Sequence, residues 1–155
     1  MVFAHLPAGY ITSHLISKRV SLPREAHFAF WFGSIAPDFD LVFTLFFPTI
    51  SHRLYPTHIP LFYALLSIAF LIINQSRRSQ WSILSLYFLL GCWLHLLLDS
   101  PTGLLLLFPI NTQRIQLTQS RMSFIEYFQS SAFYLEFLII IPFFISLLMK
   151  ILKRQ

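Results

Sequence analysis

The chain has 155 residues, of which 56% are hydrophobic and only 11% are charged. Soluble domains carry about 25% charged residues, so this composition excludes an ordinary soluble domain and predicts an integral membrane protein. The net charge of +5 comes from short basic clusters between apolar segments, which is a pattern of membrane topology, and no nucleic-acid partner is expected. The single cysteine, Cys92, excludes an intrachain disulfide and a multi-cysteine zinc site.

The lengths of the apolar segments predict an all-α fold. We expect a small helical bundle integral to the membrane, with about three spanning helices and several short half-membrane or interfacial helices. The length favours one domain over residues 1–155. The lipid bilayer is the expected partner, and the sequence leaves the oligomeric state open.

The first apolar segment, residues 8–17, is too short to cross a membrane, because ten helical residues cover about 15 Å. His5 precedes this segment, and His14 lies on it nine residues later, on a different helical face. His14 is kept as a rival or supplement to His5, because the early helix could place it nearer the other candidate residues. The next helix begins near Pro23 and stops at Pro37, and its His27 is expected at the cytoplasmic interface.

Two acids follow this helix in the sequence Pro37-Asp38-Phe39-Asp40. In extended chain, Asp38 and Asp40 would project to the same side and supply hard oxygen ligands to one or two divalent ions. Residues 41–50 are apolar but too short to span as a helix, so the chain should return to the face that it left. Asp40 would then share a membrane face with the polar cluster of residues 51–58.

A helical hairpin is predicted by two apolar segments, residues 59–73 and 81–98, joined by a basic loop. His95 and Asp99 close the second helix and lie one turn apart on one face. An imidazole and a carboxylate in that arrangement can bind a cation together. The alternative is that His95 and Asp99 form a buried pair with only a structural role between helices.

The remainder of the chain supplies one more long helix. A helix break at residues 100–103 and a polar loop at residues 111–120 precede a capping-box pattern, Ser123 with Glu126. The last helix should run from there to about Met149, with a kink near Pro142. Glu136 lies within it and is a possible additional site residue, because ionisable groups inside membranes are usually functional.

The basic clusters predict the orientation of the chain. Residues 18–24, 77–78 and 150–154 carry these clusters, and the positive-inside rule places all three, with the C-terminus, in the cytoplasm. One set of ionisable residues then falls together on the opposite face: His5, Asp38, Asp40, His52, His58, His95 and Asp99. The sequence therefore predicts one shared site at the non-cytoplasmic end.

The order of four motifs resembles a known family. These are His5-Leu-Pro-Ala-Gly, Pro37-Asp-Phe-Asp, His52-Arg with Thr57-His58, and Gly91-x-x-x-His95-Leu-Leu-Leu-Asp99 followed by Pro-Thr-Gly. Together they look like the small bacterial membrane-bound metal-dependent hydrolases typified by YdjM, distantly similar to zinc-dependent phospholipase C. Where the family reads His-Arg-Gly-x-Thr-His-Ser, this chain reads His-Arg-Leu-Tyr-Pro-Thr-His-Ile. Whether His52 ligates beside His58 therefore stays open.

The resemblance implies a metal-dependent hydrolase in the bacterial inner membrane. It makes a set of six residues the expected metal ligands: His5, Asp38, Asp40, His58, His95 and Asp99. A mixed shell of this kind suits one or two ions, with Zn²⁺ preferred and Mn²⁺ possible. In this scheme Asp38 or Asp40 bridges ions or acts as base, and Arg53 clamps a phosphate of a lipid or lipid-linked phosphoester.

Two other classes of function are kept as alternatives. A haem or electron-carrier protein would use paired histidines such as His58 and His95, but it would not need the carboxylates. A membrane scaffold or transporter component would use the polar cluster as a structural element or an ion path. An ion path should continue into polar residues along the spans, and residues 59–73 offer only Tyr63 and Ser67 there.

Overall fold

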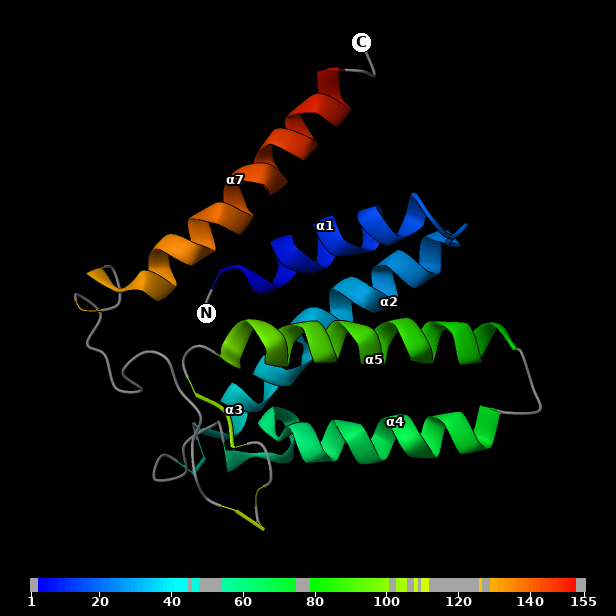
Figure 1. The fold of residues 1–155 in the computed structure, drawn as a ribbon, viewed down its shortest axis with the longest axis vertical. Helices are drawn as coiled ribbons and strands as arrows, with labels where there is room; N and C mark the ends of the chain where they lie inside the picture. Colours follow the sequence, from blue (N-terminus) through cyan, green and yellow to red (C-terminus); the bar gives the residue numbers. More distant parts are fainter. Residues whose placement is uncertain are drawn as a thin grey trace.

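The computed structural model describes residues 3–44, 46–47, 54–74, 79–100, 103–105, 108, 110–111, 126 and 129–152. These residues confirm the all-α prediction (Figure 1). In chain order the elements are α1 (His5–Ser17), α2 (Arg24–Ile35), the 3-10 helix η1 (Ala36–Asp40), α3 (Leu41–Thr44), the 3-10 helix η3 (Pro56–His58), α4 (Pro60–Asn74), α5 (Gln80–Asp99) and α7 (Ser131–Leu152).

Helices α4 and α5 form the predicted hairpin, with bounds within one residue of those expected (Figure 1). The start of α5 is capped by Ser79, whose hydroxyl accepts a hydrogen bond from the backbone N–H of Ser82 at 3.1 Å. Near the other end of the hairpin, the indole N–H of Trp93 donates to the Ser67 hydroxyl at 3.1 Å. The hydrogen bond from Trp93 to Ser67 joins α5 to α4.

Among the described residues, two helices are long and apolar enough to cross a membrane, Gln80–Asp99 and Phe133–Leu152. Helix α4 is apolar as well, but its 15 residues cover about 22 Å, short of a hydrocarbon core of about 30 Å. The large apolar side chains on the outer faces are exposed, as at Ile73 and Leu138. These exposed side chains give the bundle an apolar exterior that suits lipid, while several of its buried side chains are polar or charged.

The most extensive helix contact joins α2 to α5, and glycines make it possible. A Cβ on Gly91 would collide with the backbone of Phe30 and Ser34, and a Cβ on Gly33 would collide with the backbone of Phe88. Small residues at such crossings let helix backbones approach closely. Helix α1 then packs on α2, and α7 packs on α1 (Figure 1).

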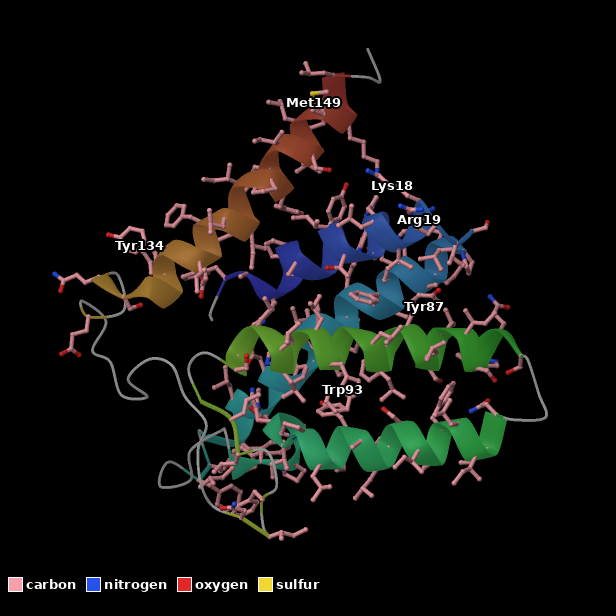
Figure 2. All side chains as sticks on the ribbon, viewed as in Figure 1. Lys18, Arg19, Tyr87, Trp93, Tyr134 and Met149 are labelled. Carbon is pink, nitrogen blue, oxygen red and sulfur yellow. The ribbon has the colours of Figure 1, made fainter. Side chains whose placement is uncertain are left out.

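The two ends of the bundle differ in charge, as the sequence predicted. Lys18 and Arg19 lie at the end where α1 gives way to α2, together with the start of α5 (Figure 2). The start of α1 and the end of α5, which carry His5 and Asp99, lie at the other end (Figure 1). Lys150 of α7 lies with the basic end, because its ammonium is 5.8 Å from the ring of Tyr10.

The last part of the chain was predicted only in part. Helix α7 runs from Ser131 to Leu152 and contains Pro142, close to the predicted end at Met149. The loop at residues 112–120 and Ser123 of the capping box lie outside the described residues. The prediction of one continuous helix from Ser123 is wrong, because the chain bends at Ser130 and α7 begins at Ser131.

Candidate metal centre

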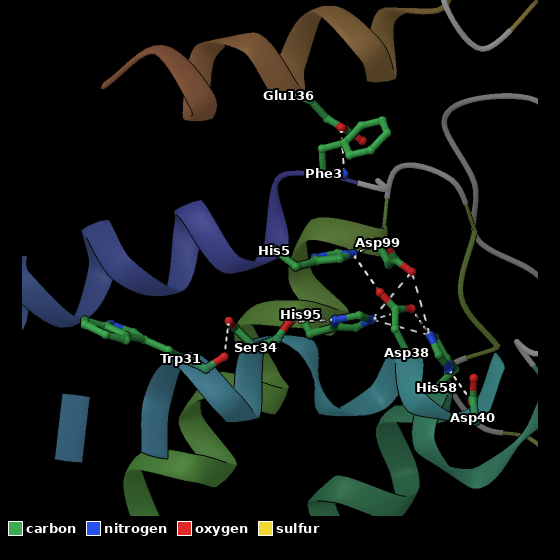
Figure 3. Close-up of polar contacts among 10 residues, drawn as sticks. All are labelled: Phe3, His5, Trp31, Ser34, Asp38, Asp40, His58, His95, Asp99 and Glu136. Atoms are coloured by element: carbon green, nitrogen blue, oxygen red, sulfur yellow. Dashed lines mark hydrogen bonds and ion pairs between the residues drawn. The ribbon is translucent and has the colours of Figure 1, made fainter. Parts of the chain in front are cut away.

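Five ionisable side chains meet at one end of the bundle, and each is delivered by the end of a helix (Figure 3). His5 is the first residue of α1, Asp38 lies in η1 after α2, and His58 ends η3 before α4. His95 and Asp99 occupy the last two turns of α5. Four elements that are separate in sequence thus place their polar residues around one point.

The segment after α2 differs from the prediction. Asp38 and Asp40 were expected in extended chain with both carboxylates on one side, but they lie in the 3-10 helix Ala36–Asp40. With three residues per turn, side chains two positions apart point in different directions. The two carboxylates consequently lie on opposite sides of the His58 ring: Oδ1 of Asp38 is 3.4 Å from Nε2, and Oδ2 of Asp40 is 2.8 Å from Nδ1.

A backbone carbonyl holds the ring of His95. Its Nδ1 lies 2.9 Å from the carbonyl oxygen of Ser34, and the side chain is fully buried. A carbonyl oxygen only accepts hydrogen bonds, so Nδ1 must carry the proton and Nε2 keeps its lone pair. The glycine-mediated approach of α2 to α5 brings Ser34 into this position. The fold therefore fixes both the orientation and the tautomer of His95.

A carboxylate plays the same part for His58. The Nδ1 atom of this buried ring contacts Asp40, and the hydroxyl of Thr57 donates to the same carboxylate oxygen. Asp40 is itself buried, with 3% of its surface exposed. An imidazole whose far nitrogen bonds a carboxylate or a backbone carbonyl is the usual arrangement around metal-ligating histidines.

The atoms that face the centre have spacings suited to one cation. Nε2 of His58 lies 3.4 Å from Nε2 of His95, and Oδ1 of Asp38 is 3.4 Å and 3.6 Å from these two nitrogens. Oδ2 of Asp99 is 3.9–4.0 Å from both. Donors held 2.0–2.1 Å from a tetrahedral zinc ion are roughly 3.3 Å apart. A small contraction of this cluster would therefore place both imidazoles and a carboxylate on one ion.

His5 approaches the same carboxylates from the other side. Its Nε2 lies 3.3 Å from Oδ1 of Asp99 and 3.8 Å from Oδ2 of Asp38, the oxygens that face away from His58. Its ring stacks on His95 with centroids 3.9 Å apart. Neither ring nitrogen of His5 has a hydrogen-bond partner among the described residues, although both are buried. Two sets of side chains can thus hold a cation: His5, Asp38 and His95, or His58, His95 and Asp99.

The charge distribution at this end favours a cation. Burial lowers the pKa of His58, but its hydrogen bonds with Asp38 and Asp40 outweigh burial and raise the pKa to about 9. Burial raises the pKa of Asp38, but the hydrogen bond from His58 and the nearby imidazoles keep it below its ordinary value. Without a metal, the cluster therefore binds a proton on His58 at neutral pH.

The cluster is buried except on one side. His5, His58, His95 and Asp99 expose at most 3% of their surface. The side chain of Asp38 is 30% exposed. A small molecule would therefore reach the cluster past Asp38.

The comparison with known families gives one match. The family model for YdjM inner membrane proteins matches residues 1–155, the whole chain. The chain belongs to the YdjM family. No curated protein and no solved structure matches it significantly. The family description agrees with the two long apolar helices and supports a place in the inner membrane.

Other residues predicted for the site of this YdjM-family chain lie elsewhere. His14 is at the basic end, with its ring centroid 4.9 Å from that of His27. Glu136 is buried on α7 and accepts a hydrogen bond from the backbone N–H of Phe3 at 3.0 Å (Figure 3). His52 and Arg53 lie outside the described residues, so their roles stay predictions.

Two contributors to the centre were not predicted. Ser34 acts through its backbone carbonyl, which carries no signal in the side-chain pattern. Gly91 acts by its lack of a side chain, four residues before His95. A small residue one turn before a histidine in a membrane helix is a signal that could have indicated a close helix crossing.

Proposed function

We propose that this chain is a membrane-bound metal-dependent hydrolase that acts on a phosphoester or related bond of a lipid-like substrate. One observation carries the proposal. His58 and His95 are each held at Nδ1 by an acceptor, and their Nε2 atoms point at each other across 3.4 Å beside two carboxylates. Two nitrogen lone pairs at this distance need a proton or a metal ion between them, and a divalent ion would replace the proton that His58 carries without a metal. The donor set suits Zn²⁺ first and Mn²⁺ second.

Each side chain has a distinct part in this proposal. His58, His95, Asp38 and Asp99 would hold the ion, and His5 would contact the outer oxygens of the two carboxylates or hold a second ion. Asp40 would orient His58, because it bonds the nitrogen that faces away from the centre. When bound, a divalent ion would supply Lewis acidity and a water activated for attack on a phosphoester.

Asp38 is the proposed proton acceptor. It is the cluster member open to the outside, and its second oxygen faces away from His58. A carboxylate in that position can accept a proton from an incoming nucleophile while its first oxygen stays in the centre. Arg53 keeps its predicted part as the phosphate clamp.

An apolar groove supports a substrate with a hydrocarbon part. The groove has a volume of about 530 Å³, and its walls include Pro60, Leu96, Leu97 and Leu104. Pro60 follows His58 by two residues, and Leu96 and Leu97 lie between His95 and Asp99 in sequence. An acyl chain in this groove would lie beside the end of α5 that carries His95 and Asp99.

The proposal is tested with purified protein loaded with Zn²⁺ or Mn²⁺ and a panel of short-chain phosphodiesters and phosphomonoesters. We expect turnover by the wild type and a loss of about 10²–10⁴-fold in Asp38→Asn, because this variant removes the base. Lys18→Gln, at the opposite end, is the control. Metal-loaded wild type that hydrolyses no member of the panel would favour the alternative of a scaffold with a structural His/Asp cluster.

A further inference from the structure

The end of the bundle opposite the metal centre holds a second polar pocket that the proposed function does not use. It has a volume of about 560 Å³ and lies among α1, α2 and α7. Four of its wall residues can carry positive charge: His14, Arg24, His27 and Lys150. Three helices that are distant in sequence thus direct basic side chains to one cavity.

The basic groups have no acidic counterpart in the described part of the chain. The ion pairs seen there gather at the metal centre, and none joins Arg24 or Lys150 to a carboxylate. Glu25 is next to Arg24 in sequence but is not part of the pocket wall. Unpaired cations around a cavity create a positive potential that favours an anion.

One of the two imidazoles of the pocket is fixed by a backbone carbonyl, and the other has a buried nitrogen that could still bond a ligand. Nδ1 of His14 lies 2.9 Å from the carbonyl oxygen of Tyr10, so this nitrogen carries a proton. Nδ1 of His27 is buried and has no hydrogen-bond partner among the described residues. Burial, His14 and Lys150 together hold the pKa of His27 below its ordinary value, as expected where positive groups crowd together.

An aromatic wall gives the pocket a fixed shape. The indole N–H of Trp31 donates to the Ser13 hydroxyl at 2.7 Å, and Ser13 in turn donates to the carbonyl of Tyr10 at 2.9 Å. The ring of His14 lies nearly parallel to Trp31, with an interplanar angle of 9°. The pocket is therefore built on a hydrogen-bonded framework that joins α1 and α2.

The surroundings of the pocket are apolar. Phe28, at its rim, is 48% exposed, and Leu15 on α1 and Met149 on α7 are about half exposed as well. Lys150 belongs to the last turn of an apolar helix long enough to cross a membrane. Basic residues at such a helix end lie at the depth of lipid headgroups. We propose that this pocket binds the phosphate headgroup of an anionic phospholipid.

The test measures lipid binding by native mass spectrometry of the detergent-purified full chain. The probes are dioctanoyl phosphatidylglycerol, dioctanoyl phosphatidylcholine and inorganic phosphate. We expect the wild type to retain phosphatidylglycerol at least tenfold better than phosphatidylcholine. Arg24→Gln and Lys150→Gln should each weaken phosphatidylglycerol binding about fivefold, since one basic group near a headgroup contributes about that factor.

Matched variants separate this site from general charge attraction. Lys18→Gln removes one exposed charge at the same end but outside the pocket, and it should leave binding unchanged. Lys150→Arg should retain binding. Arg24 and Lys150 are exposed, so their replacement should not unfold the protein. Equal losses in Lys18→Gln and Lys150→Gln would overturn the proposal, and so would retention of inorganic phosphate without phosphatidylglycerol. Metal content should be the same in all these variants.

Discussion

Both ends of this bundle contain clustered histidines, but the histidines have acidic neighbours at one end and basic neighbours at the other. At one end, His5, His58 and His95 meet carboxylates. At the other end, His14 and His27 meet Arg24 and Lys150 around one pocket. Helix α1 contributes to both, because it begins with His5 and carries His14 nine residues later.

The difference shows that the partners of a histidine decide its chemistry. Carboxylates hold the pKa of His58 at about 9 and make its end of the bundle attractive to cations. Burial and positive neighbours lower the pKa of His27, and the charges of Arg24 and Lys150 make its end attractive to anions. Helix position alone does not distinguish these cases, since His5 and His14 belong to one helix. The predictions that follow exchange or remove partners at each end.

The largest effect is expected when a histidine is removed from the carboxylate end. His95→Ala removes one central donor and should abolish metal content, which we expect to be about one or two ions per wild-type chain purified without chelator. His14→Ala removes the same side chain from the basic end and should retain the wild-type content. Elemental analysis of the detergent-purified proteins measures both. Equal metal content in the two variants would show that the ends do not differ as proposed.

A smaller effect is expected when a donor is kept but its orienting partner is removed. Asp40→Asn retains the size of the side chain but removes the carboxylate charge that contacts Nδ1 of His58. Metal affinity should fall about 10–100-fold. Competition with a chromogenic chelator gives the affinity, and Thr57→Val should cost less because it leaves the carboxylate in place. An Asp40→Asn variant with no metal at all would instead make Asp40 a ligand.

Gly91→Ala tests whether the helix crossing sets the geometry of the carboxylate end. The added methyl group would lie 2.8 Å from the backbone nitrogen of Ser34 and would push α2 away from α5. We expect a loss of about 1–3 kcal/mol in stability, together with weaker metal binding, because His95 loses the Ser34 carbonyl. Thermal unfolding and metal titration check the two effects. Leu86→Ala, on an exposed part of the same helix, should leave metal binding intact.

The smallest effect is a difference in titration between the ends. In the metal-free protein, NMR should show His58 titrating near pH 9 and His27 below its ordinary pKa. Since the folded pKa of His58 exceeds the unfolded value of about 6.5, its protonation stabilises the metal-free fold fully below pH 6.5. This contribution is lost as the pH rises through 9. Metal affinity should rise about tenfold per pH unit over that range, because the ion displaces the proton. A His58 that titrates near pH 6.5 would contradict the carboxylate contacts.

Much of the architecture could be predicted from the sequence. The hairpin of α4 and α5 was predicted within one residue, because apolar segments of fixed length are bounded by polar residues. Basic clusters at 18–24 and 150 predicted which end would be positive, and the described residues Lys18, Arg24 and Lys150 lie there. Grouping by membrane face brought His5, Asp38, His58, His95 and Asp99 together before any contact was known.

The sequence by itself indicated which residues gather at one end of the bundle, because the length and charge of each segment depend on that segment alone. Only the tertiary structure decided how those residues meet. The 3-10 turn that separates Asp38 from Asp40 and the Ser34 carbonyl on His95 follow from how α2 packs on α5. The pairing of His14 with His27 follows from how α1 packs on α2. Such contacts require several helices to be placed with a precision of a few tenths of an ångström. The sequence of a single segment does not specify that placement.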